Sequence, residues 1–115
     1  MARNRFIDSQ GRVFFVESLI GAASDLKIIE CPINREWLME QKIEWQLENL
    51  RDFTVHFQKV LDADLNQPLI LRSDGYPMDG WHRIAKALII GRETLPAKQF
   101  IVDPEPDYII KNHQE

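Results

Sequence analysis

The sequence has few of the features that mark secreted or membrane chains. Its 115 residues contain a single cysteine, Cys31, so no disulfide can form within the chain, and a domain of this length needs none. No apolar run approaches the ~18 residues of a membrane span, and the N-terminus carries no apolar signal segment. We therefore expect a cytoplasmic protein in a reducing compartment, with no membrane partner and with Cys31 as a buried strand thiol.

Basic charge is also scarce. Fourteen Lys and Arg against eighteen Asp and Glu give a net charge of -4 and a pI near 5.4. A general DNA-binding surface normally shows a basic excess, so a nucleic-acid partner is not expected. Repeats and low-complexity linkers are absent as well, which predicts a single domain over residues 1–115.

The chain does have the composition of a globular protein, with 44% hydrophobic and 28% charged residues. Predicted strands and helices alternate along it, as in α+β proteins. Extended pieces are expected on both sides of a Ser-Gln-Gly turn at residues 9–11, and a short helix over 17–24. Further strands are predicted at 26–33, 69–71 and 95–102, and a helix from Asp79 or Gly80 to Gly91. The tail is expected to be a surface segment or a short terminal helix. Together these elements predict an α+β fold with a small mixed β-sheet.

Residues 35–61 show strong helical periodicity, and Asn34 is placed as the N-cap. Apolar residues fall on one face at 100° per residue, namely Met39, Ile43, Leu47, Leu50, Phe53, Phe57, Val60 and Leu61. We expect one long helix, or two helices with a break near Glu48 that neither Pro nor Gly marks.

The stretch "GYPMDGWHRIAKALIIG" (75–91) carries the chemistry. A helix N-terminus presents unpaired N–H groups and about half a positive charge, which favours an anion. Gly80 lets a phosphate approach the backbone, while His82 and Arg83 add donors in the first turn. Asp79 fits as an N-cap or as a Mg²⁺ ligand, and Ser73 in the preceding turn can add a contact. Alternatively, Asp79 only caps the helix, Gly80 only eases a turn, and His82 and Arg83 are solvated.

The order strand, turn, "MDGWHRIAKALIIG" and "ETLPAKQF" resembles the ParB/sulfiredoxin-like superfamily over about residues 26–102. Its members run from an apolar strand into a "DG-x-HR" or "GERR" element, a short helix ending at Gly, and a further strand. The resemblance implies that Gly80, His82 and Arg83 contact nucleotide phosphates, and that Asp79 lies near the metal or the substrate. Trp81 stands inside this element and is counted with the site.

Several residues of this chain differ from the motifs of the family, and these differences limit which of the family's activities it can have. Sulfiredoxins carry a cysteine where this chain has Trp81, so their sulfinate chemistry is excluded. Partition proteins carry a helix-turn-helix module after this domain, for which no residues follow. Free-serine kinases keep "DGHHR", the nearest motif, and use a glutamate base near the first strand. The resemblance therefore implies Glu30 or Glu36 as the base.

A second surface is suggested by residues 36–52. Glu36, Glu40, Glu44, Glu48 and Asp52 recur every four residues, which is typical of a solvated face and lacks the extra ligands of a metal site. Trp37, Leu38 and Trp45 lie away from the main apolar arc and need cover, either within the fold or from a homodimer or protein partner. His56, without a second ligand at i+4, is interpreted as a surface histidine.

Two functions remain open. One is a nucleotide-binding domain that takes Mg²⁺ with ATP, ADP or CTP. The more specific version of this hypothesis is a phosphotransferase or an NTP hydrolase. In that case Glu30, Asp79 and His82 are the candidate catalytic residues. The alternative is a non-catalytic protein-interaction or regulatory module. DNA partition or nuclease function is a weaker third reading because of the acidic charge.

Overall fold

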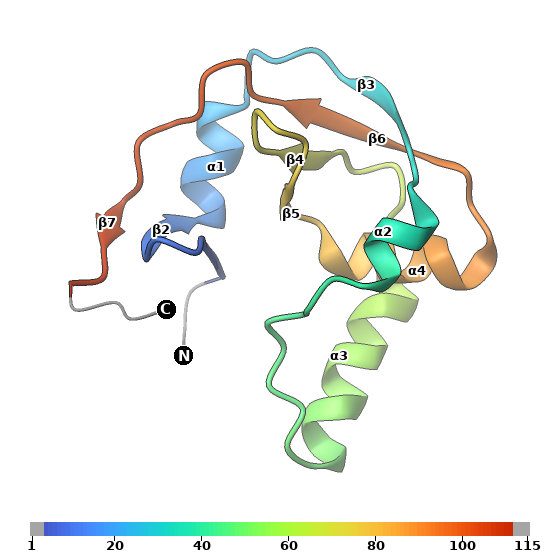
Figure 1. Ribbon diagram of the computed structural model, residues 1–115. Helices are drawn as coiled ribbons and strands as arrows, with labels where there is room; N and C mark the ends of the chain where they lie inside the picture. Colours follow the sequence, from blue (N-terminus) through green and yellow to red (C-terminus); the bar gives the residue numbers. More distant parts are fainter. Residues whose placement is uncertain (1–3, 112–115) are drawn as a thin grey trace. The chain divides into compact units, whose positions relative to one another are not determined.

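The structure is a computed structural model that describes residues 4–111. The chain forms two compact units, which are described separately (Figure 1). The first unit contains the N-terminal residues up to Lys27, the segment Ile70–Asp79 and the residues from Lys98 onward. The second contains Ile28–Leu69 and Gly80–Ala97.

The first unit begins with a hairpin of β1 (Arg5–Ile7) and β2 (Arg12–Phe15), which pair antiparallel. Gly11 supplies the positive φ of 79° that the expected turn requires. Asp8 holds the turn from inside, since its carboxylate accepts bonds from the Gln10 N–H at 2.9 Å and the Arg12 Nε at 2.6 Å. Burial raises the pKa of Asp8, but the hydrogen bonds from Arg12 and Gln10 and the charge of Arg12 outweigh this effect and leave the pKa lowered.

Three further elements lie wholly in this unit: α1 (Val16–Ala22), β5 (Pro77–Asp79) and β7 (Tyr108–Ile109). The predicted short helix over 17–24 is thus confirmed. A terminal helix is not, because β7 pairs antiparallel with β2 and extends the hairpin. β5 pairs antiparallel with β4 (Leu69–Leu71) across a turn in which Gly75 has a φ of 92°, a conformation that favours glycine.

Aromatic and aliphatic side chains fill the centre of the first unit. The buried cluster consists of Phe14, Leu19, Ala23, Ile70, Met78 and Phe100, with Phe6 and Leu26 packed against it. The rings of Phe6 and Phe14 lie 6.0 Å apart, and those of Phe6 and Tyr76 lie 5.9 Å apart. Segments from both ends of the chain therefore share one apolar core.

In the second unit, β3 (Ile29–Pro32) pairs antiparallel with β6 (Thr94–Gln99). Cys31 lies half-buried in β3, where burial raises the pKa of its thiol. The chain enters α4 (Trp81–Ile90) after Gly80, and the helix ends at Gly91, whose φ of 78° makes it the expected C-terminal glycine.

The long helix predicted over 35–61 is wrong as a continuous element, and the two-helix alternative is correct. α2 spans Arg35–Met39 and α3 spans Leu50–Asp62, with non-helical chain between them. Each helix has its own N-cap: the Asn34 side chain accepts from the Trp37 N–H at 3.1 Å, and Asn49 accepts from the Asp52 N–H at 2.9 Å.

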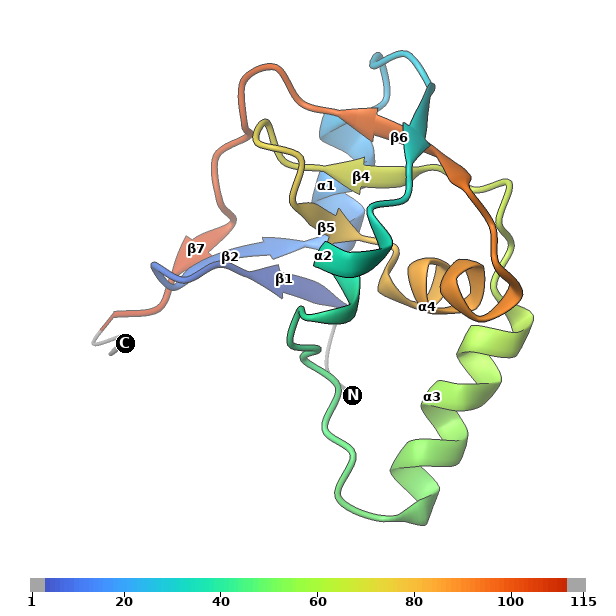
Figure 2. The same cartoon turned by 45° about the vertical axis from the view of Figure 1, so that its right-hand side comes forward.

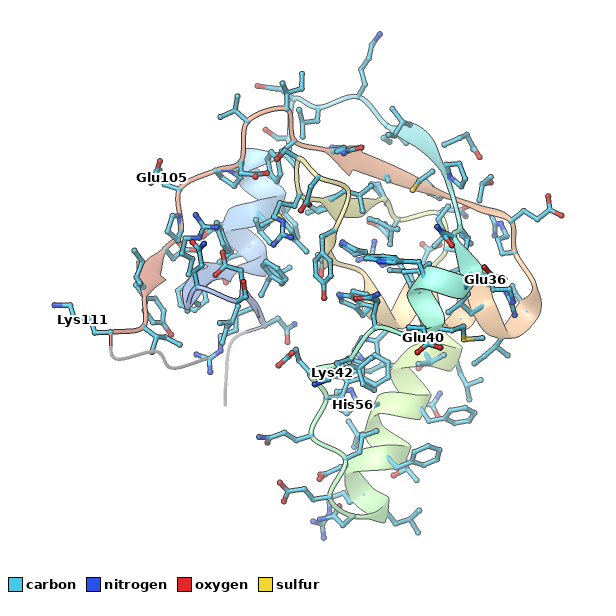
Figure 3. All side chains as sticks on the ribbon, in the orientation of Figure 1. Glu36, Glu40, Lys42, His56, Glu105 and Lys111 are labelled. Atoms are coloured by element: carbon cyan, nitrogen blue, oxygen red, sulfur yellow. The ribbon has the colours of Figure 1, made fainter. Side chains whose placement is uncertain are left out.

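A physical reason for the break lies in the acidic ladder. A continuous helix would align five carboxylates at i,i+4 spacing, and each such pair repels by a few tenths of a kcal/mol. The break removes the alignment: Glu36 and Glu40 lie at α2, separate from α3 (Figure 3). The sequence signal for it was the Asn49–Asp52 pair, since Asp52 also accepts from the Glu48 N–H at 3.1 Å and so closes the N-terminus of α3.

Bonds from cationic side chains to carbonyls hold α4 to α3 and to the chain that follows α3. The Lys86 Nζ donates to the carbonyls of Leu61 at 2.9 Å and Ala63 at 2.8 Å. Figure 2 shows that the C-terminal end of α3 lies beside α4, whereas the N-terminal half of α3 extends away from it. The expected α+β class is confirmed by these helices and strands.

Candidate functional site at the N-terminus of helix α4

The start of α4 depends on Gly80. This residue is the N-cap with a φ of 114°, and its carbonyl accepts the first helical bond from the Ile84 N–H at 2.9 Å. A Cβ at this position would collide with the Leu69 side chain, so packing as well as backbone conformation requires glycine. Asp79 is the last residue of β5, so the N-cap position of α4 belongs to Gly80 and not to Asp79.

His82 lies in the first turn of α4 and is bonded to His56 of α3. The His56 Nδ1 and His82 Nε2 are 3.0 Å apart, and the two rings are within 5° of coplanar. One nitrogen donates and the other accepts, so the neutral pair shares a single proton along this bond. His56, labelled on α3 in Figure 3, is half-buried, and its interpretation as a surface histidine is wrong.

Trp45, from the non-helical chain before α3, covers both imidazoles. Its ring stacks on His56 at 5.0 Å and on His82 at 4.4 Å, with interplanar angles of 9° and 7°. The cover that Trp45 was expected to need is therefore supplied within the chain, at least on this face. Trp37 is still 42% exposed, and Leu38 is half-buried.

The surroundings of His82 keep its imidazole neutral. Burial is the largest cause that lowers the pKa of His82 to about 4, and the electrostatic effects of His56, Lys59 and Arg83 contribute to the same shift. At neutral pH this ring supplies no positive charge to an anion. It is instead a proton acceptor whose pKa would rise if a negative group were bound beside it.

Arg83 is engaged with the backbone before β4. Its Nη1 donates to the carbonyls of Gln67 at 3.0 Å and Pro68 at 2.6 Å. Arg83 therefore fixes the chain that leads into Leu69, the residue on which Gly80 packs. Any contact with a phosphate would come in addition to this structural role.

The remaining predicted site residues lie in several elements. Trp81 is the half-buried first residue of α4, and Glu30 is exposed on β3 opposite Pro96. Ser73 belongs to the first unit, where its N–H and its Oγ both donate to the Asp103 carboxylate at 2.8 Å. Ser73 is thus held by Asp103, a partner that the motif did not suggest.

Sequence reasoning missed His56 and Trp45 as members of this site. They lie 26 and 37 positions before His82 in the chain, and no motif spacing connects them to it. Only the packing of α3 on α4 brings the two histidines together.

A separate hollow lies at the other end of α4. It has a volume of about 300 Å³ and is lined by Ile33, Arg35, Gly91, Arg92 and Glu93. Arg35 already donates to the Leu88 carbonyl at 2.6 Å, and Glu93 places a carboxylate beside the two arginines. These features give the hollow no clear preference for an anion.

Comparisons of the chain with known protein families, with curated proteins and with solved structures find no match. Over residues 4–111 no helix combines the length and the apolarity needed to cross a membrane. The same residues contain no cluster of three or more His, Cys, Asp or Glu side chains placed to hold a metal ion.

Proposed function

We propose that the chain binds the phosphates of a nucleotide at the N-terminus of α4, and that His82 moves a proton there with His56 as its partner. The observation that carries this proposal is the hydrogen-bonded imidazole pair stacked on Trp45 in the first turn of α4. Burial disfavours the charged form of a histidine and so lowers its pKa. Groups whose pKa is perturbed in this way concentrate at functional sites. The similarity of "DGWHR" to the ParB/sulfiredoxin-like element supports the same location.

The roles follow from the chemistry of each group. The first amides of α4 and the Arg83 guanidinium attract the phosphate oxygens. The bound negative charge raises the pKa of His82, which then accepts the proton of an attacking hydroxyl or water at Nδ1, while its Nε2 stays bonded to His56 Nδ1. The attacking oxygen bonds to the terminal phosphorus as the bond from that phosphorus to the bridging oxygen breaks, and the nucleotide leaves one phosphate shorter. Asp79, directly before Gly80, would hold Mg²⁺ together with phosphate oxygens, which suits a cation that uses one or two carboxylates. This arrangement corresponds to an ATP- or ADP-dependent phosphotransferase or an NTP hydrolase.

Calorimetric titration with magnesium complexes of ATP, ADP and CTP tests the binding. Arg83→Ala should weaken binding by roughly 1.5–3 kcal/mol, the range for a hydrogen bond to a charged group. Lys86→Ala is the matched control, because Lys86 also bonds α4 to backbone carbonyls but lies one turn further from the helix start. Equal losses in both variants would assign Arg83 a structural role only, and no heat from any nucleotide would refute the site.

The proton-transfer role is tested on turnover. His82→Gln should abolish phosphate release or transfer while leaving nucleotide affinity within about threefold, since a neutral ring contributes little to anion binding. His56→Gln should lower kcat and move the acidic limb of its pH profile. A His82→Gln protein with unchanged kcat would remove His82 from the mechanism.

The second candidate, a non-catalytic protein-interaction module, is favoured by the internal bonds of His82 and Arg83. In such a module the imidazole pair only packs α3 on α4, and Trp37, 42% exposed, offers surface to a partner. Nucleotide binding without turnover, unaffected by His56→Gln, would support this candidate.

A further inference from the structure

The two imidazoles that join α3 to α4 are aligned end to end. The rings of His56 and His82 are within 5° of coplanar, and their centres lie 5.2 Å apart. This separation is close to the 3.0 Å between His56 Nδ1 and His82 Nε2 plus the short distance from each ring centre to its own nitrogen, so the nitrogens lie on the line between the centres. Each nitrogen therefore points directly at the other in the common plane of the rings.

Trp45 covers the gap between these two nitrogens. The centre of its ring lies 4.4 Å from that of His82 and 5.0 Å from that of His56, and its plane is within 9° of both. Together the three separations place the indole centre about 4 Å from the midpoint between the imidazoles. A cation at that midpoint would lie against the face of the indole, at the distance of a cation–π contact.

We propose that His56 Nδ1 and His82 Nε2 bind one soft monovalent metal ion of the Cu(I) class in a linear, two-coordinate site beneath Trp45. Imidazole nitrogen is a suitable ligand for copper. Monovalent ions with a filled d shell accept two opposed ligands in a line, whereas Zn²⁺ takes four ligands in structural protein sites. In the part of the chain that the structure describes, no third His, Cys, Asp or Glu side chain joins the pair to hold a metal. The number of donors therefore selects a two-coordinate ion.

The charges around the pair also favour a single positive charge over two. Burial lowers the pKa of His82 to about 4, so the ring is neutral at pH 7 and few protons compete with a metal. The electrostatic effects of Lys59 and Arg83 contribute to the same shift, so positive charge is disfavoured at this place. Their repulsion of an ion doubles when the charge of the ion doubles, and it therefore opposes Zn²⁺ or Cu²⁺ more than Cu(I).

Insertion of the ion needs a small movement and the transfer of one proton. A bond from imidazole nitrogen to a metal is about 2 Å long, so the two nitrogens must separate by about 1 Å beyond the 3.0 Å of their hydrogen bond. The proton of that bond moves through water to the outer nitrogen of its own ring, which is Nε2 in His56 or Nδ1 in His82. Both rings then stay neutral, the ion gains two nitrogen ligands, and no net proton is released.

Titration of the full chain with Ag(I), which is a redox-stable analogue of Cu(I), tests the site by calorimetry. The single thiol of the chain also binds soft metals, so the Cys31→Ser chain is the reference protein. It should bind one Ag(I) per chain, with a heat that does not depend on the protonation enthalpy of the buffer. His56→Gln and His82→Gln in this reference should each weaken binding about a hundredfold or more, since loss of a ligand costs more than a change beside one. The matched control is His113→Gln, which removes the third histidine of the sequence and should bind like the reference.

Spectroscopy tests the geometry without relying on the folding of a histidine variant. In the reference protein the ¹⁵N signals of His56 Nδ1 and His82 Nε2 should shift together as Ag(I) is added. X-ray absorption of the Cu(I) form, prepared without oxygen, should show a linear two-coordinate ion with nitrogen ligands at about 2 Å. Trp45→Leu should weaken Ag(I) binding about three- to tenfold through loss of the cation–π contact.

Three results would overturn this metal site. They are no binding of Ag(I) by the Cys31→Ser chain, undiminished binding by a folded His56→Gln or His82→Gln variant, and tighter binding of Zn²⁺ than of Ag(I). Circular dichroism establishes which variants are folded, and the ¹⁵N shifts decide the question if neither histidine variant is. The titration contains no nucleotide, so its failure is separate from that of the proposed function.

Discussion

In the first unit Val13 and Leu19 are almost completely buried, whereas in the second unit Leu50 and Phe53 remain largely exposed on α3. The first unit holds together through a cluster of aromatic and aliphatic side chains from three segments of the chain. The second unit also buries aliphatic side chains, among them Leu95 at 1% and Ile84 at 3% exposed. It adds cationic side chains bonded to carbonyls, and two imidazoles stacked under one indole. Apolar burial is therefore expected to stabilise both units, whereas the buried polar pairs gather in the second.

Apolar burial and buried polar pairs contribute differently to a fold. Apolar burial is non-directional and contributes most of the stability of a fold. Buried polar pairs such as His56 with His82 contribute less net free energy but specify which groups meet. The unit that contains the imidazole pair is also the one that contains the candidate site.

The largest effect is expected from Phe14→Ala in the first unit. Phe14 is 5% exposed within the main cluster, so its truncation should lower the free energy of unfolding by about 3–5 kcal/mol. The matched change in the second unit is Phe53→Ala, which should cost less than ~1 kcal/mol because that ring is half exposed. Urea denaturation of both variants measures the difference, and similar losses would show that the burial of the two rings does not set their contributions to stability.

A smaller loss of stability is expected when the hydrogen bonds of Lys86 in the second unit are removed. Lys86→Met keeps most of the apolar stem but removes both bonds to the Leu61 and Ala63 carbonyls, at a cost of roughly 1.5–3 kcal/mol. Hydrogen exchange should show the loss of protection in α3 and α4. Lys42→Met, at an exposed position of the same unit, should be close to neutral. If the Lys42 variant lost as much, the carbonyl bonds would not be the cause.

A pH dependence of about 1–2 kcal/mol is expected from His82. Its pKa is near 4 in the folded chain and near 6.5 when unfolded, so between these values the unfolded state binds more protons. Stability should consequently fall as the pH drops from about 6.5 to 4. The loss should be smaller than the ~1.4 kcal/mol per pKa unit of linkage, because solvent screens a ring that is only partly buried. Denaturation at several pH values should give a flatter profile for His82→Gln, and an unchanged slope would contradict the prediction.

The smallest loss of stability should come from removing the N-cap of α3, Asn49. Asn49→Ala removes the acceptor of the Asp52 N–H and should cost about 1 kcal/mol. Asn49→Asp retains an oxygen acceptor and should be nearly neutral. Helix content by circular dichroism and thermal melting report the change, and a loss in the Asp variant equal to that in the Ala variant would argue against a capping role.

Local patterns in the sequence predicted most of the elements correctly. The glycine turns at Gly11 and Gly75, the Asn34 cap and the end of α4 at Gly91 follow from conformational rules that involve only neighbouring residues. The helix over residues 40–49 failed because good helix formers were overridden by the second cap at Asn49 and by the place of Trp45 on the imidazoles. The C-terminal strand was missed because β7 exists only through its pairing with β2.

The candidate site divides in the same way. From the order of its residues alone, the chain determined that a glycine-started helix carries His82 and Arg83 in its first turn, because caps and first turns are local features. Tertiary structure decided that His82 meets His56 under Trp45, and that Arg83 bonds to the carbonyls before β4. It also decided that Leu50 and Phe53 of α3 are left exposed. Those outcomes depend on which faces of distant segments pack together, and the burial and charge that set the pKa of His82 arise only from that packing.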